Sequence, residues 1–514
     1  MKRIVMLVAN NWEIDSRVIR EASAVAAAGY DVHVICDKAE PAYTEVVSEG
    51  VTYHCLPAWR PREHLTQLPG MLGYHMRVAA LAVIGAAKDH RPCQALLLAA
   101  KLTLGLVLAI AMAPFLTVLL GLVLIAGKLI RPLKPTLKKL PFYPALAKVR
   151  ERIWRDFVHG TLRNARKAIW HHFAIDSAHY LNQFGIRGAP LALSLKPDLV
   201  HAHDLVTLSG GYAVARATGS PLIYDAHELE THTNYWGLNP HMRRWVEIYE
   251  RTLIGKSTAI VTVCESIADW LRDNYHIPRP IVVHNTPNLE KIAPGERTKT
   301  TLRSVAGISK DVPLAVYVGS VTIDRGLVEC VRALAFAPKL HFAFVGPRYI
   351  ETEKEILATA LEIDVSDRVH LIDAVPSSQV TGFVSDADCS VIAIQNVCLS
   401  YYFCFPNKLL ESVLADVPVV VARLIELENF VARFHTGLVA DETDPAAIAA
   451  AVMEVIANKA NLRPTAATRE AIITEYGWAT QRKKLLDLYA RIFTPKRAMP
   501  TLKEASSGRT ALVS

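Results

Sequence analysis

A lysine and a glutamate three residues apart stand at the start of a short predicted helix in the C-terminal third of the chain. The residues of this stretch are Pro406, Asn407, Lys408, Leu409, Leu410 and Glu411. Free N–H groups at the start of a helix, together with Lys408, attract an anion, and Glu411 one turn further in can accept hydrogen bonds from two vicinal hydroxyls. A diphosphate joined to a ribose fits these groups. The alternative is an ordinary α/β connection with a lysine and a glutamate on its surface.

A second candidate phosphate loop follows the predicted strand 313–318. It contains Gly319, Ser320, Arg325 and Gly326, and the next predicted strand, 340–345, ends at Gly346. Glycines let the backbone approach a phosphate closely, and an arginine adds a forked cation. Such a loop is weak evidence alone, but together with Lys408 at the same edge of a sheet it predicts a clamp for a diphosphate.

Histidines and carboxylates follow two predicted strands in the N-terminal half. His203 and Asp204 follow the first of these strands, and Asp225, His227 and Glu228 follow the second. Because parallel strands end at a common edge, these side chains should converge there. We expect His203 to face a bound ligand from the side opposite the diphosphate clamp; the alternative for a histidine at a strand end is a structural role.

The N-terminus also predicts a ligand-binding edge. Residues 4–9 form an apolar strand, a loop over 10–17 carries Asn11, Asp15 and Arg17, and a helix then runs through Ala28 to a second strand at 30–35. In a βαβ unit of this kind the loop lies at the carboxyl edge of the sheet.

Together these motifs resemble the retaining glycosyltransferases of family 4. The matching residues are Pro-Asn-Lys-Leu-x-Glu at 406–411 before Pro-Val-Val at 418–420, Asp-x-Arg-Val at 15–18, His-x-His-Asp at 201–204, and Tyr-Asp-x-His-Glu at 224–228. The resemblance implies an α/β fold of the GT-B type, with two Rossmann-like domains facing across a cleft. It also implies hexosyl transfer from a UDP- or GDP-sugar without a metal or cofactor, because cations and helix N-termini hold the leaving diphosphate.

Site residues follow from the same resemblance. Catalytic roles are expected for His203, Asp204 and Glu411. Donor binding is expected for Gly319, Ser320, Arg325, Gly326, Gly346, Pro406, Asn407, Lys408, Leu409 and Glu411. Acceptor-side positions are expected at Asn11, Asp15, Arg17, Asp225, His227 and Glu228.

The chain departs from the family pattern at three places. The acceptor-side loop lacks a Gly-Gly pair, and Ser320 stands where many members carry a second basic residue. The common pattern of two glutamates separated by seven residues would end at Glu411 and place the first at Phe403. The ribose contact is therefore expected to remain, while a carboxylate that helps to seat the donor sugar is missing.

Length and composition set the domain plan. At 514 residues the chain exceeds one core, and its eight cysteines show no metal-ligand spacing, which fits a reducing compartment. The basic start Met1-Lys2-Arg3 precedes a strand rather than a signal peptide. We expect an N-terminal domain over 1–295 with a helical insertion at 70–190, a nucleotide-sugar domain over 296–472, a helix at 473–495 that crosses back, and a disordered tail at 496–514.

The insertion is strongly apolar. Residues 102–127 carry no charge, Pro114 divides them, and 131–167 hold eleven basic residues against two acidic ones. Since both flanking parts must share one sheet, we expect 92–130 to form a hairpin that enters and leaves the bilayer from the cytoplasmic face, with the basic stretch on anionic lipid. A buried helical pair and, for the basic stretch, a nucleic-acid patch are the alternatives.

These expectations converge on sugar transfer from a nucleotide sugar to a membrane-borne, lipid-linked glycan acceptor in polysaccharide or glycolipid synthesis. No nucleic-acid partner is expected. A membrane-docked scaffold that binds a nucleotide sugar without turnover, and a nucleotide-sugar 2-epimerase, are the alternatives. Release of free UDP or GDP separates the enzyme from the scaffold, and the identity of the product sugar separates it from the epimerase.

Overall fold

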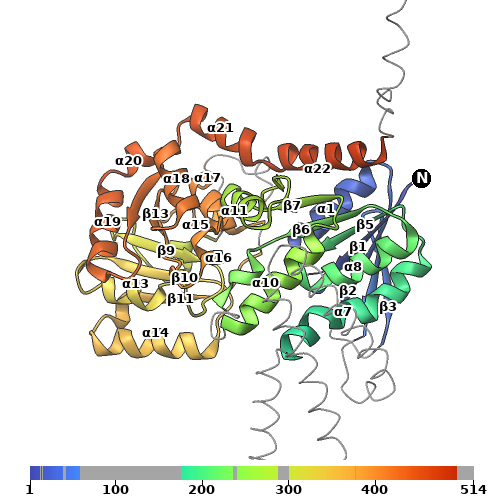
Figure 1. Cartoon of the computed structure of the whole chain (residues 1–514). Coiled ribbons are helices and arrows are strands. Elements are labelled where there is room, and N and C mark those ends of the chain that lie inside the picture. Colours follow the sequence, from blue (N-terminus) through green and yellow to red (C-terminus); the bar gives the residue numbers. More distant parts are fainter. Residues whose placement is uncertain are drawn as a thin grey trace, which may run out of the picture.

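Two sheets, one parallel throughout and one parallel apart from an edge strand, organise the chain in the computed structural model (Figure 1). The structure describes residues 1–11, 13, 15–38, 42–57, 175–234, 240–286, 300–376 and 378–494. Among these, the first sheet has the order β3-β4-β2-β1-β5-β6-β7-β8 and the second has the order β11-β10-β9-β12-β13-β14. The predicted GT-B architecture of two Rossmann-like domains is confirmed.

The first sheet belongs to the N-terminal domain. Its strands are β1 (Arg3–Val8), β2 (Asp31–Asp37), β3 (Thr44–Ser48), β4 (Val51–Leu56), β5 (Leu199–His203), β6 (Leu222–Ala226), β7 (Ala259–Thr262) and β8 (Ile281–Val282). Neighbouring strands are parallel except β3 and β4. The helical elements of this domain are α1 (Ser16–Ala27), α7 (Ile175–Ser194), α8 (Leu205–Thr218), η4 (Glu230–His232), α10 (Pro240–Ile254) and α11 (Glu265–Tyr275).

The second sheet belongs to the C-terminal domain and is parallel throughout. Its strands are β9 (Leu314–Val318), β10 (His341–Val345), β11 (Val369–Ile372), β12 (Cys389–Ile392), β13 (Val419–Ala422) and β14 (Gly437–Ala440). Its helical elements are α12 (Leu302–Ala306), α13 (Leu327–Ala333), α14 (Ile350–Glu362), η6 (Ser366–Arg368), α15 (Val380–Val384), α16 (Leu399–Tyr402), α17 (Asn407–Leu414), α18 (Ile425–Phe434), α19 (Pro445–Ala457), α20 (Lys459–Leu462) and α21 (Ala466–Tyr476).

Apolar, β-branched runs form the central strands because helices cover both faces of each sheet. Every residue of β5, β6 and β9 is buried. The antiparallel pair β3–β4 has no counterpart in the sequence-based prediction. Its turn is made by Glu49 and Gly50, both with positive φ (50° and 77°), which fits a tight hairpin.

The last helix returns to the N-terminal domain, as Figure 1 shows. α22 (Trp478–Phe493) buries Leu485, Leu488 and Tyr489 against the first sheet, in a cluster with Ile4 and Met6 of β1. The Tyr489 hydroxyl is 2.8 Å from Nδ1 of His201 in β5. The chain therefore passes between the domains twice, once after β8 and once before α22.

The membrane placement expected from the sequence requires correction. In the part of the chain that the structure describes, no helix has the length and apolar character needed to cross a bilayer. The expected hairpin at 92–130 and the basic stretch at 131–167 lie outside the described residues, as does the tail at 496–514. The cytoplasmic-face membrane localisation is therefore not retained.

Candidate active site

The C-terminal domain presents a lysine over a tyrosine ring at the carboxyl ends of its strands. Lys408, in the first turn of α17, places Nζ 3.9 Å from the ring centroid of Tyr317, the fourth residue of β9. Burial and, to a smaller extent, the nearby Arg325 lower the pKa of Lys408 to about 7. The side chain makes no ion pair with any residue that the structure describes. An anion that binds beside Lys408 would stabilise its charged form and offset the cost of burying it.

Arg325 forms a second cation–aromatic contact beside the first. Its guanidinium carbon lies 4.8 Å from the ring centroid of Tyr401 in α16. The arginine stands between two left-handed residues, Asp324 (φ 61°) and Gly326 (φ 65°). A Cβ at Gly326 would lie 2.3 Å from the carbonyl oxygen of Ala393, so only glycine fits there. The backbone thus fixes the direction in which Arg325 leaves the loop.

The glycines at the ends of β9 and β10 bring these loops together. Gly319 donates its backbone N–H to the carbonyl of Val345, and a Cβ at Gly346 would lie 2.1 Å from the carbonyl oxygen of Gly319. Ser320 is exposed, and its carbonyl accepts a hydrogen bond of 2.9 Å from the Tyr317 hydroxyl. Tyr317 therefore holds both the loop backbone and the Lys408 ammonium.

Helix α17 begins as the sequence predicts, with Pro406 at its N-cap and Asn407 as its first residue. Leu409 is fully buried and anchors the helix in the domain core. Burial raises the pKa of Glu411 to about 7, although Lys408 and Arg20 act in the opposite direction. Arg20 belongs to α1, so Glu411 lies within electrostatic range of the N-terminal domain.

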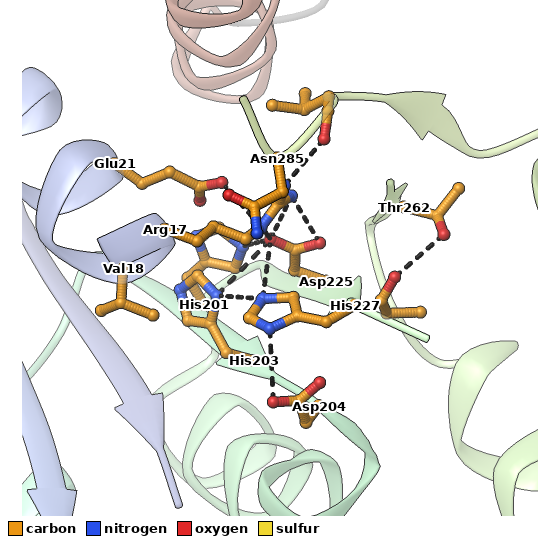
Figure 2. A network of polar contacts seen from close by, with 12 residues as sticks. Arg17, Val18, Glu21, His201, His203, Asp204, Asp225, His227, Thr262 and Asn285 are labelled. Carbon is orange, nitrogen blue, oxygen red and sulfur yellow. Dashed lines mark hydrogen bonds and ion pairs between the residues drawn. The ribbon is translucent and has the colours of Figure 1, made fainter. Parts of the chain in front are cut away.

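A buried ion-pair network occupies the carboxyl ends of β5 and β6 in the N-terminal domain (Figure 2). Arg17 of α1 donates Nη2 to both oxygens of Asp225 at 2.9 and 2.8 Å, and Nη1 to the carbonyl of Val283 at 2.8 Å. Its Nε is 3.0 Å from Glu21 one turn further along the helix. Burial would raise the pKa of Asp225, but Arg17 and His227 hold it well below the usual range.

His227 is the protonated histidine of this network. Its Nδ1 is 3.3 Å from Asp204 and its Nε2 is 3.4 Å from Asp225. Burial alone would lower the pKa of His227, but the carboxylates of Asp204 and Asp225 raise it to about 9. The imidazolium side chain is 15% exposed and that of Asp204 is 34% exposed, so these two groups reach the surface of the cleft.

His203 lies beneath them. Its ring is fully buried, with Nδ1 3.1 Å from His227 and 3.5 Å from Asp225. Its Nε2 has no hydrogen-bond partner among the residues that the structure describes. This placement differs from the expectation that His203 faces the cleft, because β5 is covered on both sides and His227 stands over its tip.

A metal would compete with Arg17 in this network. Glu21, His201, His203 and Asp225 bring one ligand atom each within 4.8 Å of one another. The Arg17 guanidinium, however, already neutralises Glu21 and Asp225 from inside the cluster, and a metal ion there would be repelled by it. The residues present therefore fit an arginine-centred ion pair better than a metal site.

The remaining acceptor-side predictions separate into structural and exposed residues. Asp15 caps α1 by accepting the N–H of Val18 at 3.1 Å, and Asn11 bonds within its own loop to Glu13. Glu228 is exposed after β6. Of the predicted acceptor-side residues, those whose side chains reach the cleft are therefore His227 and Glu228, which follow β6.

Several contributors carried little sequence signal. Glu21 stands four residues after Arg17 and His201 two before His203, so helical and strand spacing could have indicated both. Tyr317, Tyr401 and Asp324 had no motif to mark them. Asp386 and Asp388, a possible Asp-x-Asp metal motif, are engaged by Arg303 and Lys459: Asp388 lies 2.6 and 2.9 Å from them.

Two protein-family profiles match the chain, one in the N-terminal domain and one in the C-terminal domain. Residues 160–291 match the profile of Glycosyltransferase Family 4, and residues 298–473 match that of Glycosyl transferases group 1. Together the two matches span more than half of the chain. The chain belongs to the family 4, group 1 glycosyltransferases.

Relatives of this glycosyltransferase differ in their substrates. A D-inositol 3-phosphate glycosyltransferase of Xylanimonas cellulosilytica is 25% identical over 310 residues, covering 57% of this chain and 72% of the relative. A glycogen synthase of Mycobacterium tuberculosis is 22% identical over 319 residues, covering 60% of this chain and 73% of the relative.

Solved structures share the fold. A sucrose-phosphate synthase from Thermosynechococcus elongatus superposes with a TM-score of 0.62 at 15% identity, covering 96% of this chain and 99% of that chain. A UDP-forming trehalose-phosphate synthase from Burkholderia vietnamiensis gives 0.54 at 14% identity, covering 95% and 99%. At these identities the likeness concerns the GT-B fold alone.

Proposed function

We propose that this glycosyltransferase transfers a hexose from a UDP- or GDP-sugar to a hydroxyl acceptor, with retention of anomeric configuration and without a metal ion. The observation that carries the proposal is the pair Lys408 and Arg325, two cations placed over tyrosine rings with no ion-pair partner among the described residues. A nucleoside diphosphate supplies the two negative groups that this pair lacks.

The leaving diphosphate is stabilised by these two side chains and by the first N–H groups of α17. Lys408 becomes fully protonated when the diphosphate binds, because a neighbouring anion favours the charged form. Glu411, one turn into α17, accepts the ribose hydroxyls. From the opposite wall, the His227 imidazolium and Asp204 are the groups available to the sugar or the acceptor.

The acceptor is proposed only as a hydroxyl compound. The lipid-linked glycan expected from the sequence depended on the membrane placement, which is not retained. Retention and metal independence are taken from the resemblance to the family. Product analysis by NMR would test retention, and turnover in excess chelator would test metal independence.

The donor site is tested by calorimetry with UDP and GDP. We expect Arg325→Ala and Glu411→Ala each to weaken nucleotide binding by about 10- to 100-fold, the loss typical of a hydrogen bond to a charged group. Arg332→Ala is the matched control for Arg325→Ala. Arg332 is exposed in the last turn of α13, and both substitutions remove one positive charge. Unchanged affinity in both site variants would refute the assignment.

A further inference from the structure

One residue of the N-terminal domain touches the loop of the C-terminal domain that carries Arg325. Asn234, in the segment after η4, donates Nδ2 to the carboxylate of Asp324 at 2.7 Å. Its backbone N–H faces the sulfur of Cys398, the N-cap residue of α16. Helix α16 in turn packs against η4. The segment after β6 therefore closes on the C-terminal domain through Asn234.

Both contacts of Asn234 lead to Arg325. Asp324 directly precedes Arg325 in the loop after β9, and its carbonyl accepts the N–H of Gln395 at 3.2 Å. Cys398 begins the helix whose Tyr401 ring lies against the Arg325 guanidinium. The arginine is thus held from its backbone side through Asp324 and from its side-chain side through Tyr401.

The backbone at Asp324 is in an uncommon conformation that such a contact helps to hold. A non-glycine residue with φ of 61° is disfavoured, and Gly326 two residues on is also left-handed. Strained positions of this kind persist when surrounding contacts over-determine them. In the described structure, the side-chain contact of Asp324 comes from the other domain.

We propose that Asn234 is a positioning residue that couples contact between the two domains to the direction of the Arg325 guanidinium. When the domains are together, the Asn234–Asp324 hydrogen bond holds the loop with Arg325 aimed at the diphosphate. When they part, Asp324 loses its partner and the loop relaxes. The role assigned to Arg325 rests on the proposed function, whereas the contact itself does not.

The first experiment needs no substrate. The rate of alkylation of Cys398 by N-ethylmaleimide, mapped by mass spectrometry, reports how often the contact opens. We expect Asn234→Ala to accelerate this rate about tenfold, as loss of one hydrogen bond to a charged group predicts. Thr233→Ala is the matched control, because its hydroxyl bonds to the carbonyl of Glu230 within the same segment, and its rate should stay near that of the wild type.

The second experiment exchanges the two partners. Asn234→Asp sets two carboxylates against each other and should weaken UDP or GDP binding by about tenfold or more. The double variant Asn234→Asp with Asp324→Asn restores an amide–carboxylate pair, and asparagine tolerates the left-handed backbone at 324. We therefore expect the double variant to regain the wild-type nucleotide affinity and the wild-type alkylation rate.

The outcomes separate the two ideas. Equal alkylation rates in wild type and Asn234→Ala, or a double variant no better than Asn234→Asp, would overturn the positioning role. If wild type binds neither UDP nor GDP, the role of Arg325 falls with the proposed function, and the alkylation rates still decide whether Asn234 holds the two domains. A simple loss of folding would lower the melting temperature and would not be reversed by the exchange.

Discussion

Lys408 and Glu411 stand one turn apart in α17 and titrate in the same range, each with a pKa of about 7. The causes are the same in kind, since burial disfavours the charged form of both. A bound diphosphate would favour the charged form of Lys408 again, because it places a negative charge beside the ammonium group. The free site is therefore prepared for an anion, and the binding reaction should exchange protons with the solvent.

Proton uptake should accompany nucleotide binding at pH 8. Lys408 is mostly neutral there in the free protein, and the bound diphosphate raises its pKa, so about one proton is taken up per UDP or GDP. Glu411 is mostly ionised at pH 8 and contributes only a small fraction of a proton. Calorimetry in buffers of different ionisation enthalpy measures the uptake.

Lys408→Arg is the matched control, because arginine keeps the charge and does not titrate in this range. It should bind without proton uptake. A wild-type binding enthalpy that is independent of the buffer at pH 8, or equal uptake in Lys408→Arg, would contradict the assignment.

At the scale of elements, the N-terminal domain joins β6, α10 and α11 through one buried carboxyl group. Glu250 of α10 accepts hydrogen bonds of 2.7 Å from the hydroxyls of Tyr224 in β6 and Tyr275 at the end of α11. Burial raises the pKa of Glu250 to about 7, although both hydrogen bonds lower it. The protonated form is therefore favoured in the folded protein relative to the unfolded chain.

Glu250→Gln should stabilise the protein at high pH and leave it unchanged at low pH. The folded pKa of Glu250 lies above the unfolded value of 4.5, so the folded state binds more protons between pH 4.5 and 7 and stability from this group falls as pH rises. The full effect is about 3 kcal/mol above pH 7. Glutamine keeps partners for both tyrosines without the charge.

Melting temperatures of wild type and variant at pH 5 and pH 8 check this prediction. Glu454→Gln on α19 is the control, because Glu454 is exposed. A difference between Glu250→Gln and wild type that is the same at both pH values would show that Glu250 does not titrate as described.

Sequence reasoning predicted the secondary-structure elements better than it predicted the positions of single side chains. Apolar runs followed by polar tips predicted the strands and the edges where ligands bind, because strand ends in parallel sheets share one edge. Which tip residue reaches the cleft could not be predicted, since β5 and β6 are buried on both faces and alternation carries no exposure signal. His203 therefore lies inside, and His227 stands at the surface.

For the whole molecule, contacts between the domains decide what the departure at Phe403 means. Phe403 and Phe405 pack against the core cluster of the N-terminal domain, and the carbonyl of Phe403 accepts a hydrogen bond of 3.1 Å from the Cys264 thiol at the start of α11. The N–H of Ser266 bonds to Glu426 of α18 nearby. Such contacts join residues more than a hundred positions apart, so no local pattern in the sequence marks them.

The family pattern would place a glutamate at 403, and Phe403→Glu tests whether that position serves the donor here. The carboxylate would meet the apolar cluster around Cys264, so we expect a lower melting temperature and no gain in UDP or GDP affinity, at a cost of about 1–3 kcal/mol for burying an unpaired polar group. Phe403→Leu keeps an apolar contact and should stay within about 1.5 kcal/mol of the wild type. Thermal unfolding and calorimetry measure both quantities. If Phe403→Glu were as stable as Phe403→Leu and bound a UDP-sugar more tightly than the wild type, position 403 would face the donor rather than the neighbouring domain.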